Sequence, residues 1–313
     1  MSEDVPETER AASLRFAAID VGSNAIRLLL KRVIENGERA LFKKESLVRI
    51  PLRLGEDSFR TGRISDEKRQ ALINTMRGFH YLMQAYEPLG IMACATSAMR
   101  EAENGDEIVR DIKEQTGIEL KIIDGPAEAE IICRTSSHQL MVSSGAYLFI
   151  DVGGGSTEIT LLVDQQPVNA HSFDIGTVRI LHDQVTEEAW KELKDWLKTV
   201  TAKYDGKLTG IGSGGNINKI FRLASIKNSK PITLKQIKQI HNEVSALSLK
   251  ERISELRLRP DRADTIVPAG KIFLWVMKWA KMKQMIVPQI GLADGLIHIM
   301  YDWYRDQHQS LAQ

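Results

Sequence analysis

The stretch LFIDVGGGSTEITLL, residues 148–162, combines an apolar run, a glycine-rich turn and a second apolar run. The stretch AAIDVGSNAIRLLL, residues 17–30, follows the same plan around its own Asp-Val-Gly, with a loop that we estimate to be about two residues shorter. Each stretch predicts a β-hairpin of two buried strands joined by a tight turn. Asp20 and Asp151 lie 131 residues apart (151 − 20), about one domain length, which indicates a duplicated domain with two facing loops.

The rest of the chain alternates between strand-like and helix-like segments, which predicts an α/β fold. After the first hairpin we expect strands at 40–54, 90–96, 118–124 and 207–212 and helices at 65–86, 105–117, 125–141 and 186–204. No low-complexity linker separates the halves, so we expect two domains that close on one cleft. The boundaries are 1–125, of which 1–15 is expected to be disordered, and 126–295, with an amphipathic helix at 296–313 that packs back on the first domain.

Composition argues against several classes of protein. The 313 residues are 43% hydrophobic and 27% charged with a net charge of +1, which is typical of a soluble globular protein and gives no sign of a nucleic-acid polymer as partner. The sequence has no apolar run long enough to span a membrane and no signal-peptide pattern at its start, so we expect a cytoplasmic protein. Cys94 and Cys133 have no metal-ligand spacing and are expected to be free thiols.

Both loops carry the chemistry that binds phosphate. Glycine lets backbone N–H groups approach an anion closely, and hydroxyl side chains add further donors. The predicted phosphate-binding residues are Gly22, Ser23 and Asn24 in the first loop and Gly153, Gly154, Gly155, Ser156 and Thr157 in the second. A third loop, formed by Gly212, Ser213, Gly214 and Gly215, follows a strand and opens a helix, and either anion binding or a simple tight turn explains it.

Three carboxylates stand beside these loops. Asp20 and Asp151 each end a strand, and Glu158 follows the second loop. Carboxylate oxygens suit Mg²⁺ or Mn²⁺, which bind a few carboxylates together with water and phosphate oxygens. The alternative is that each Asp caps its own turn through side-chain hydrogen bonds.

The ordered motifs resemble those of the exopolyphosphatase and guanosine pentaphosphate phosphohydrolase family, in the fold group of actin, sugar kinases and Hsp70. The resemblance runs from about residue 16 to about residue 300. It rests on AIDVGSNAIRLLL (18–30), ATSAMREA (95–102), DGPAEAEII (124–132), IDVGGGSTEI (150–159), GSGG (212–215), RADTIVPAG (262–270) and GLADGL (291–296). It implies two actin-like domains facing a central cleft.

The resemblance also implies roles for individual residues. Glu128 matches the carboxylate that activates the attacking water, and Arg100 matches an arginine that binds phosphate. Asp151 and Glu158 match residues near the metal, with Asp20 as a further metal ligand. Arg27, Thr96 and Ser97 complete the implied substrate-binding set. Where the family often has two adjacent glutamates, this chain has Ala127 before Glu128.

The implied activity is release of terminal orthophosphate from inorganic polyphosphate, with guanosine pentaphosphate as the alternative substrate. Two basic stretches support a polyanion: residues 43–63 hold six basic and three acidic side chains, and residues 250–283 hold nine and four. A solvated helix face explains such runs equally well. Two less favoured alternative functions are an ATP-dependent kinase and an actin-like nucleotide-binding module of the same fold. The chain resembles the short, two-domain form, and a homodimer is a further way to complete a substrate channel.

Overall fold

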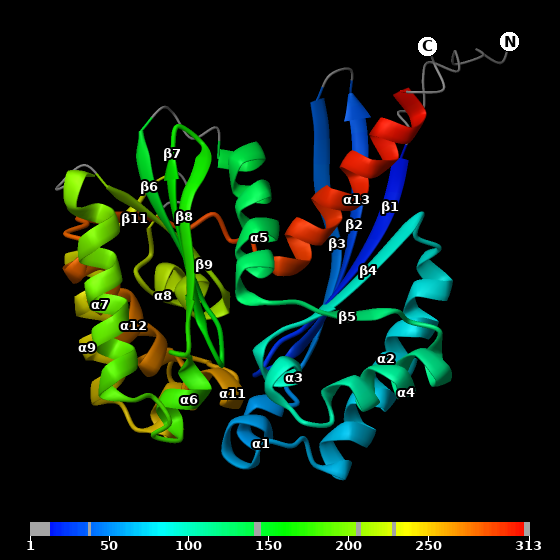
Figure 1. The fold of residues 1–313 in the computed structure, drawn as a ribbon, viewed down its shortest axis with the longest axis horizontal. Helices are drawn as coiled ribbons and strands as arrows, with labels where there is room; N and C mark the ends of the chain where they lie inside the picture. The colour runs from blue at the N-terminus through cyan, green and yellow to red at the C-terminus, as the bar shows by residue number, and fades with distance from the viewer. Residues whose placement is uncertain (1–12, 37–38, 141–144, 205–207, 227–229, 310–313) are drawn as a thin grey trace, which may run out of the picture.

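The computed structural model describes residues 13–36, 39–140, 145–204, 208–226 and 230–309 and shows two lobes side by side (Figure 1). Each lobe is built on one β-sheet with helices packed against it. Helices α5 (Gly125–Leu140) and α13 (Leu292–Gln309) lie between the lobes. This arrangement confirms the predicted α/β fold with a duplicated plan.

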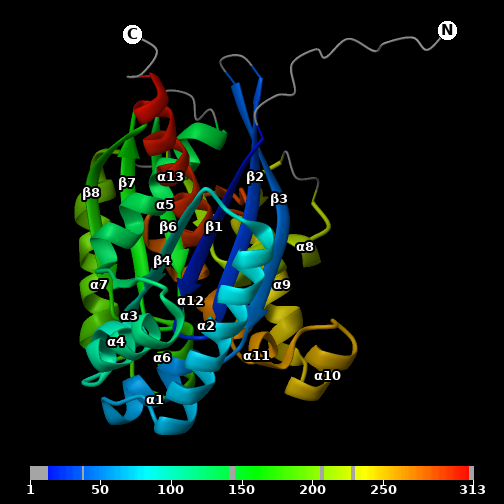
Figure 2. The ribbon, with the colours of Figure 1, turned by 90° about the vertical axis from the view of Figure 1, so that its right-hand side faces the viewer.

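The first sheet has the strand order β3-β2-β1-β4-β5. Its first three strands are antiparallel neighbours, whereas β4 and β5 run parallel to β1. The strands are β1 (Ser13–Val21), β2 (Ile26–Asn36), β3 (Arg39–Ile50), β4 (Gly90–Ala95) and β5 (Leu120–Ile122). Seen from the side of the first lobe, β2 and β3 form a long hairpin behind helix α2 (Asp66–Tyr86) (Figure 2).

The second sheet repeats this order as β8-β7-β6-β9-β11 and adds β10 at its far edge. The strands are β6 (Ala146–Val152), β7 (Thr157–Val163), β8 (Gln166–Phe173), β9 (Thr209–Ser213), β10 (Ile232–Thr233) and β11 (Gln284–Ile286). The expected difference in loop length is wrong, because each Asp pairs with the residue seven positions later, Asp20 with Arg27 and Asp151 with Glu158. Both hairpins therefore share one register.

Helices cover the outer faces of both sheets. In the first lobe they are α1 (Leu54–Thr61), α2, α3 (Ser97–Glu101) and α4 (Gly105–Thr116). In the second they are α6 (Thr177–Leu181), α7 (Glu187–Thr201), α8 (Gly215–Leu223), α9 (Leu234–Ala246), α10 (Leu249–Ser254), α11 (Pro260–Ala263) and α12 (Ile266–Trp279), with a 3₁₀ turn at Ala202–Tyr204.

Local signals set the ends of the predicted helices. The Ser65 side chain accepts from the Lys68 amide and begins α2, as predicted. Gly117 ends α4 at φ 70°, a left-handed conformation that glycine adopts without strain. Strand β1 begins at Ser13, so the expected disorder is wrong for residues 13–15, and residues 1–12 lie outside the described part. The short helices α1, α3 and α6 were not predicted, because five to eight residues carry little periodicity.

Three apolar cores hold the molecule together. One lies within each lobe, between the sheet and its outer helices. The third lies between the lobes, where Phe16 of β1 and Phe149 of β6 pack with Leu296 of α13. Both faces of the central strands are therefore buried, which explains their continuous apolar runs. Helix α13 packs against β1, β2 and β4 of the first lobe, and a 2.6 Å ion pair from the buried Lys31 to Asp294 fixes its start.

Of the two cysteines, Cys94 is buried and free, as predicted, whereas the side chain of Cys133 lies outside the described part. None of the helices in the described ranges has both the length and the apolarity needed to cross a bilayer.

Candidate active site

Two equivalent rows of side chains cross the sheets where the hairpin loops begin. In the first sheet the row runs Cys94, Asp20, Arg27, Arg49. In the second it runs Ser213, Asp151, Glu158, Ser172. Residues directly opposite one another on paired strands project on the same face of a sheet. The first row thus joins one carboxylate to two guanidinium groups, whereas the second joins two carboxylates to two hydroxyl groups.

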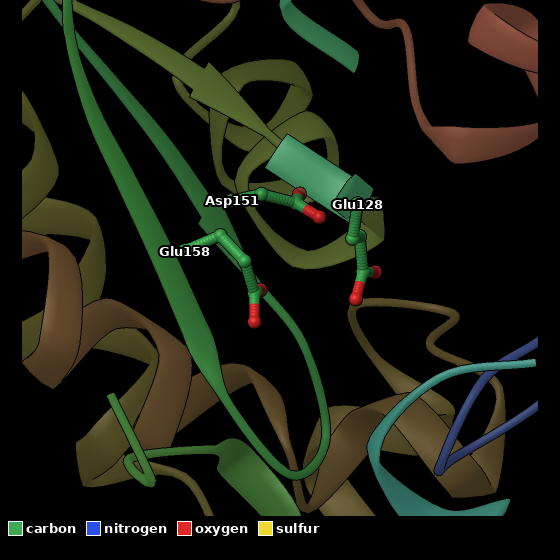
Figure 3. Close-up of side chains that lie close together, drawn as sticks. All are labelled: Glu128, Asp151 and Glu158. Atoms are coloured by element: carbon green, nitrogen blue, oxygen red, sulfur yellow. The ribbon is translucent and has the colours of Figure 1, made fainter. Parts of the chain in front are cut away.

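Glu128 completes the second row from the crossover helix. It lies in the first turn of α5, and one oxygen each of Glu128, Asp151 and Glu158 lie within 4.8 Å of one another (Figure 3). Gly125 permits this approach, because a Cβ there would lie 2.3 Å from the Ser172 Cβ. Ser172 Oγ also donates a 2.9 Å hydrogen bond to Glu158 Oε1. The tertiary fold therefore gathers the carboxylate trio, a name used below for Glu128, Asp151 and Glu158.

Burial makes ionisation of the trio costly. It raises the pKa of Asp151 to about 6 and, with the nearby Asp151 charge, raises that of Glu158 to about 7. The pKa of Glu128 is raised well above 4.5 by burial and by the charges of Glu158 and Asp151, while Arg100 acts in the opposite direction. A group whose pKa lies near neutrality is suited to accept a proton from water.

The donor set of the trio fits a hard divalent cation. Glu128 Oε2 and Asp151 Oδ1 are buried without a hydrogen-bond partner among the described residues. Three clustered carboxylates with unused oxygen lone pairs need a compensating positive charge, and Mg²⁺ or Mn²⁺ prefers such ligands. Asp20, also predicted as a metal ligand, lies outside this cluster, because its carboxylate accepts from Arg27 Nη1. That part of the metal assignment stays a prediction.

The first row is positively charged. Burial lowers the pKa of Arg27, but the charge and hydrogen bond of Asp20 outweigh it, and the net shift is upward. Arg49 is buried and forms an ion pair with Asp261, while its Nε and Nη1 have no partner in the described chain. Burial, with Arg49 and Arg27 nearby, lowers the pKa of Arg262 to about 10. Buried guanidinium groups with free donors are suited to bind phosphate oxygens.

A cleft of about 470 Å³ lies between the rows and is lined by residues of both lobes. Of the predicted site residues, its lining includes Asp20, Gly22, Ser23, Asn24, Arg27, Thr96, Ser97, Glu128, Asp151, Gly153, Gly154, Ser156, Gly214 and Gly215. Eight basic side chains line it: Arg27, Lys44, Arg49, Lys219, Arg222, Arg257, Arg259 and Arg262. Five of these belong to the two basic stretches that the sequence singled out, whereas Lys219 and Arg222 of α8 were missed because no charge run marks them.

Several predicted residues contribute from behind the lining. Arg100 Nη1 donates a 2.9 Å hydrogen bond to the Ile123 carbonyl, just before α5, instead of projecting into the cleft. Thr157 Oγ1 donates to the Ile175 carbonyl, and Ser213 Oγ to the Ile290 carbonyl. Gly155 and Glu158 are also absent from the lining. The predicted phosphate contacts of Arg100, Thr157, Ser213 and Gly155 remain predictions, and so does the predicted place of Glu158 near the metal.

The third loop divides into two parts. Gly212 is a packing glycine, because a Cβ there would lie 2.5 Å from Met285 Sδ. Gly214, at φ 100°, and Gly215 line the cleft at the start of α8. A Cβ on Gly215 would lie 2.6 Å from Arg262 Nη2, so glycine leaves room for that guanidinium. Gly214, Gly215 and Arg262 therefore line one part of the cleft together, and anion binding by the third loop stays a prediction.

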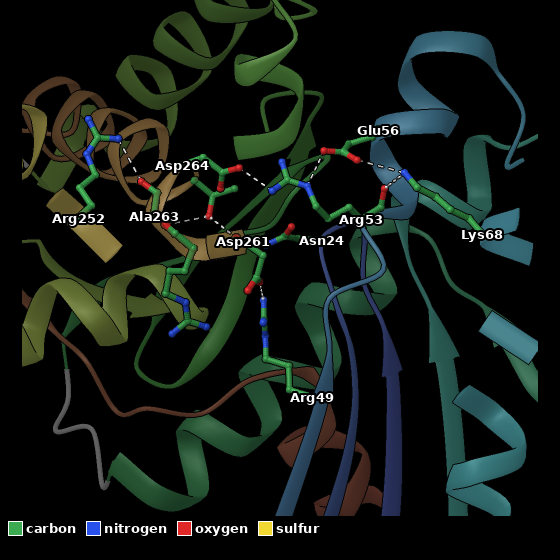
Figure 4. A network of polar contacts seen from close by, with 11 residues as sticks. Asn24, Arg49, Arg53, Glu56, Lys68, Arg252, Asp261, Ala263 and Asp264 are labelled. Carbon is green, nitrogen blue, oxygen red and sulfur yellow. Dashed lines mark hydrogen bonds and ion pairs between the residues drawn. The ribbon is translucent and has the colours of Figure 1, made fainter. Parts of the chain in front are cut away.

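Polar contacts join the two lobes at the first loop (Figure 4). Asn24 Nδ2 donates a 2.9 Å hydrogen bond to the Asp261 carbonyl of α11. Arg49 pairs with the Asp261 carboxylate, and Arg53 with Asp264. These contacts hold the row of the first lobe against helix α11 of the second lobe. The sequence did not predict them, because they join residues more than two hundred positions apart.

The duplicated lobes, the two phosphate-type loops and the buried carboxylate trio define a phosphohydrolase with the actin-like fold. The chain belongs to the Ppx/GppA phosphatase family, whose model matches residues 40–303.

Individual relatives agree with this assignment. The chain is 26% identical over 303 residues to Exopolyphosphatase 1 of Mycobacterium tuberculosis, covering 91% of this chain and 87% of that protein. It is also 28% identical over 281 residues to a bifunctional 3-dehydroquinate synthase/phosphatase of Fusobacterium nucleatum, of which it covers 42%. Among solved structures, the Cytophaga hutchinsonii exopolyphosphatase has a TM-score of 0.79 at 21% identity, covering 92% of this chain and 98% of that one. The Aquifex aeolicus PPX-GPPA enzyme has a TM-score of 0.71 at 25% identity, covering 91% and 99%.

Proposed function

We propose that this enzyme removes terminal orthophosphate from inorganic polyphosphate by attack of water on the last phosphorus, with the help of a divalent cation. The observation that carries the proposal is the opposition of the two rows. Arg27 and Arg49 line the cleft from one side, and Glu128 and Asp151 line it from the other, with Glu158 of the carboxylate trio beside them behind the lining. The names of the mycobacterial and Cytophaga relatives support polyphosphate as the substrate class.

The basic lining would hold the phosphate chain. Eight basic side chains face only four acidic ones in the cleft, Asp20, Glu128, Asp151 and Asp294. Each charge-assisted hydrogen bond to phosphate contributes about 1.5–3 kcal/mol. Arg49 supports such binding in particular, since it lines the cleft and two of its buried nitrogens have no hydrogen-bond partner among the described residues. The two glycine loops would add backbone donors near the terminal phosphate.

Glu128 would act as the general base. Its raised pKa makes it able to accept the proton of the attacking water, and its position in the first turn of α5 partly favours the ionised form. Arg100 would act through its charge, which partly offsets the rise in the pKa of Glu128, and through its hydrogen bond to the Ile123 carbonyl, two residues before α5.

Asp151 and Glu158 would hold the cation, with Glu128 as a third oxygen donor beside them. When bound, such a cation neutralises charge on the terminal phosphate and favours the ionised form of nearby water. The excess of carboxylates in the second row supports this assignment.

Phosphate release from a panel of substrates tests the proposal. Polyphosphates of several lengths, guanosine pentaphosphate and ATP should be compared with one purified preparation, with Mg²⁺, with Mn²⁺ and with EDTA. We expect cation-dependent release from polyphosphate and little from ATP.

The other outcomes point to different enzymes. Faster release from guanosine pentaphosphate than from any polyphosphate would replace polyphosphate as the substrate. Phosphate transfer from ATP to a second small molecule would indicate a kinase. Full activity in EDTA would contradict the role of the cation.

A further inference from the structure

Helix α6 holds three successive carbonyl groups of the second loop. The Gly153 carbonyl accepts from the Thr177 amide at 3.1 Å, and the Gly154 carbonyl accepts from the Val178 amide at 2.8 Å. The Gly155 carbonyl accepts from a side chain, Arg179 Nε, at 2.7 Å. Backbone donors of α6 thus serve the first two carbonyls, and Arg179 serves the third.

This pattern fixes the direction of the loop amides. In a trans peptide unit the C=O and the next N–H point in opposite directions. With the carbonyls of residues 153, 154 and 155 turned toward α6, the N–H groups of Gly154, Gly155 and Ser156 point away from it. An anion-binding loop needs its amides turned toward the ligand and its carbonyls turned away.

The other end of the Arg179 side chain reaches the first lobe. Its Nη2 forms an ion pair with Glu101 of α3, the residue after Arg100. Its guanidinium carbon lies 4.1 Å from the centre of the Phe59 ring of α1. Arg179 is only 9% exposed and is absent from the described cleft lining, so it supports the site from behind.

The second loop has little space in which to shift. A Cβ on Gly155 would lie 2.3 Å from Phe59 Cζ and 2.4 Å from Ser97 Oγ. A Cβ on Gly154 would lie 2.9 Å from the Ser23 Cβ of the first loop. The two phosphate-type loops are therefore in direct contact, at the place where Arg179 joins the lobes.

We propose that Arg179 is a positioning residue for the phosphohydrolase reaction. It holds the last carbonyl of the second loop so that the loop amides face the substrate, and through Glu101 it holds this loop against the helix that carries Ser97 and Arg100. The inference rests on the proposed function for its effect on rate, whereas its effect on the loop can be measured without any substrate. One forked guanidinium makes both contacts, which the single nitrogen of lysine does not do.

The test compares Arg179→Lys with Arg69→Lys. Arg69 is a matched control, because its guanidinium also joins two polar partners, the carboxylates of Glu107 and Asp111, but both lie within the first lobe. For Arg179→Lys we expect kcat/KM for polyphosphate to fall about 10- to 100-fold, because small displacements of substrate-positioning groups have effects of that size. Hydrogen–deuterium exchange of the amides of residues 153–157 should become faster in the substrate-free protein. Arg69→Lys should leave both the rate and this exchange close to wild type.

A second variant, Glu101→Gln, keeps the Arg179 contact with Gly155 and removes the ion pair between the lobes. We expect a smaller loss of kcat/KM and slow exchange at residues 153–157. Near-normal kcat/KM and exchange in Arg179→Lys would overturn the proposal, because charge alone would then suffice. An equal loss in Arg69→Lys would also overturn it, as a sign of general loosening. If wild type released no phosphate from polyphosphate, the proposed function would fail, and the exchange rates would still decide the role of Arg179.

Discussion

Arg27 stands opposite Asp20 in the first hairpin, and Glu158 stands opposite Asp151 at the equivalent place in the second. The register, the strand order and the glycine turn are the same in both lobes. In the first lobe the carboxylate is neutralised by its neighbour, and Arg49 adds further positive charge. In the second lobe burial raises the pKa values of Asp151 and Glu158, and the charge of Asp151 adds to the rise for Glu158.

The comparison shows that one cross-strand pair, Asp20 with Arg27 or Asp151 with Glu158, sets the charge of each row. A row with two guanidinium groups is suited to phosphate, and a row with two carboxylates is suited to a cation. With one row on each side of the cleft, the guanidinium groups suit a phosphate chain and the carboxylates suit a cation bound to it. The shared backbone plan makes the difference in side-chain charge stand out.

The largest effect is expected when the second row is given the carboxylate–arginine pair of the first row. In Glu158→Arg the new guanidinium would neutralise Asp151 and remove the cation site. We expect kcat for polyphosphate to fall by at least about 10³-fold, because cation stabilisation of the transition state amounts to several kcal/mol. Glu158→Gln, which keeps the shape of the side chain, is the matched variant and should also need more Mg²⁺ for half-maximal rate. Retention of full activity in Glu158→Arg would show that the second row binds no cation.

The next test removes the base that faces the second row. Glu128→Gln should lower kcat roughly 10²–10⁴-fold with little change in KM, because the amide cannot accept the proton of water. Glu130→Gln, at an exposed position of the same helix, is the control and should retain wild-type kcat. Steady-state kinetics with polyphosphate measure both. Near-normal turnover in Glu128→Gln would move the general-base role to Asp151 or Glu158.

A third test weakens the positive row. Arg27→Gln should raise KM for polyphosphate about 10-fold or more and change kcat little, because one charge-assisted contact contributes about 1.5–3 kcal/mol to binding. Arg32→Gln is the control, since Arg32 lies on the same strand but pairs with Glu45 at the surface. A fall in kcat with unchanged KM would instead place Arg27 among the groups that act in the transition state.

The smallest expected effect is on stability, because the raised pKa values of the second row make the free energy of unfolding depend on pH. Asp151 and Glu158 have folded-state pKa values of about 6 and about 7, above the ordinary 3.8 and 4.5. Between these limits the folded protein binds protons that the unfolded chain has released, so the free energy of unfolding falls as pH rises from about 4 to about 7. Mg²⁺ needs ionised ligands and should reverse this loss.

We therefore expect Mg²⁺ to raise the melting temperature by about a few degrees at pH 8 and hardly at all at pH 5. Differential scanning fluorimetry of the wild type and of Asp151→Asn measures the effect. The variant should lose the gain at pH 8. An equal gain in the variant would place the cation elsewhere.

Much of this fold was predictable from the sequence. Asp-Val-Gly between apolar runs occurs twice at domain spacing, and the helical periodicity of residues 65–86 carries its own cap, Ser65. These signals are local, because side-chain pattern and turn chemistry act over a few residues. The two glycine loops and the carboxylates beside the second loop could be named on the same grounds, whereas Glu128 was named through the resemblance of its segment to a known family. The short helices α1, α3 and α6 could not, since too few residues repeat in them.

By itself, then, the sequence determined the duplicated α/β plan, the two loops and the residue types that suit phosphate and a cation. Only the tertiary structure decided which of these residues contact one another. It placed Glu128 with Asp151 and Glu158, paired Asp20 with Arg27, and brought Arg49 to Asp261 across the lobes. It also turned Arg100 to the Ile123 carbonyl and drew Arg179 to Gly155. The physical reason is that charge pairing and burial depend on distances in space, and strand register and lobe packing set those distances between residues far apart in the chain.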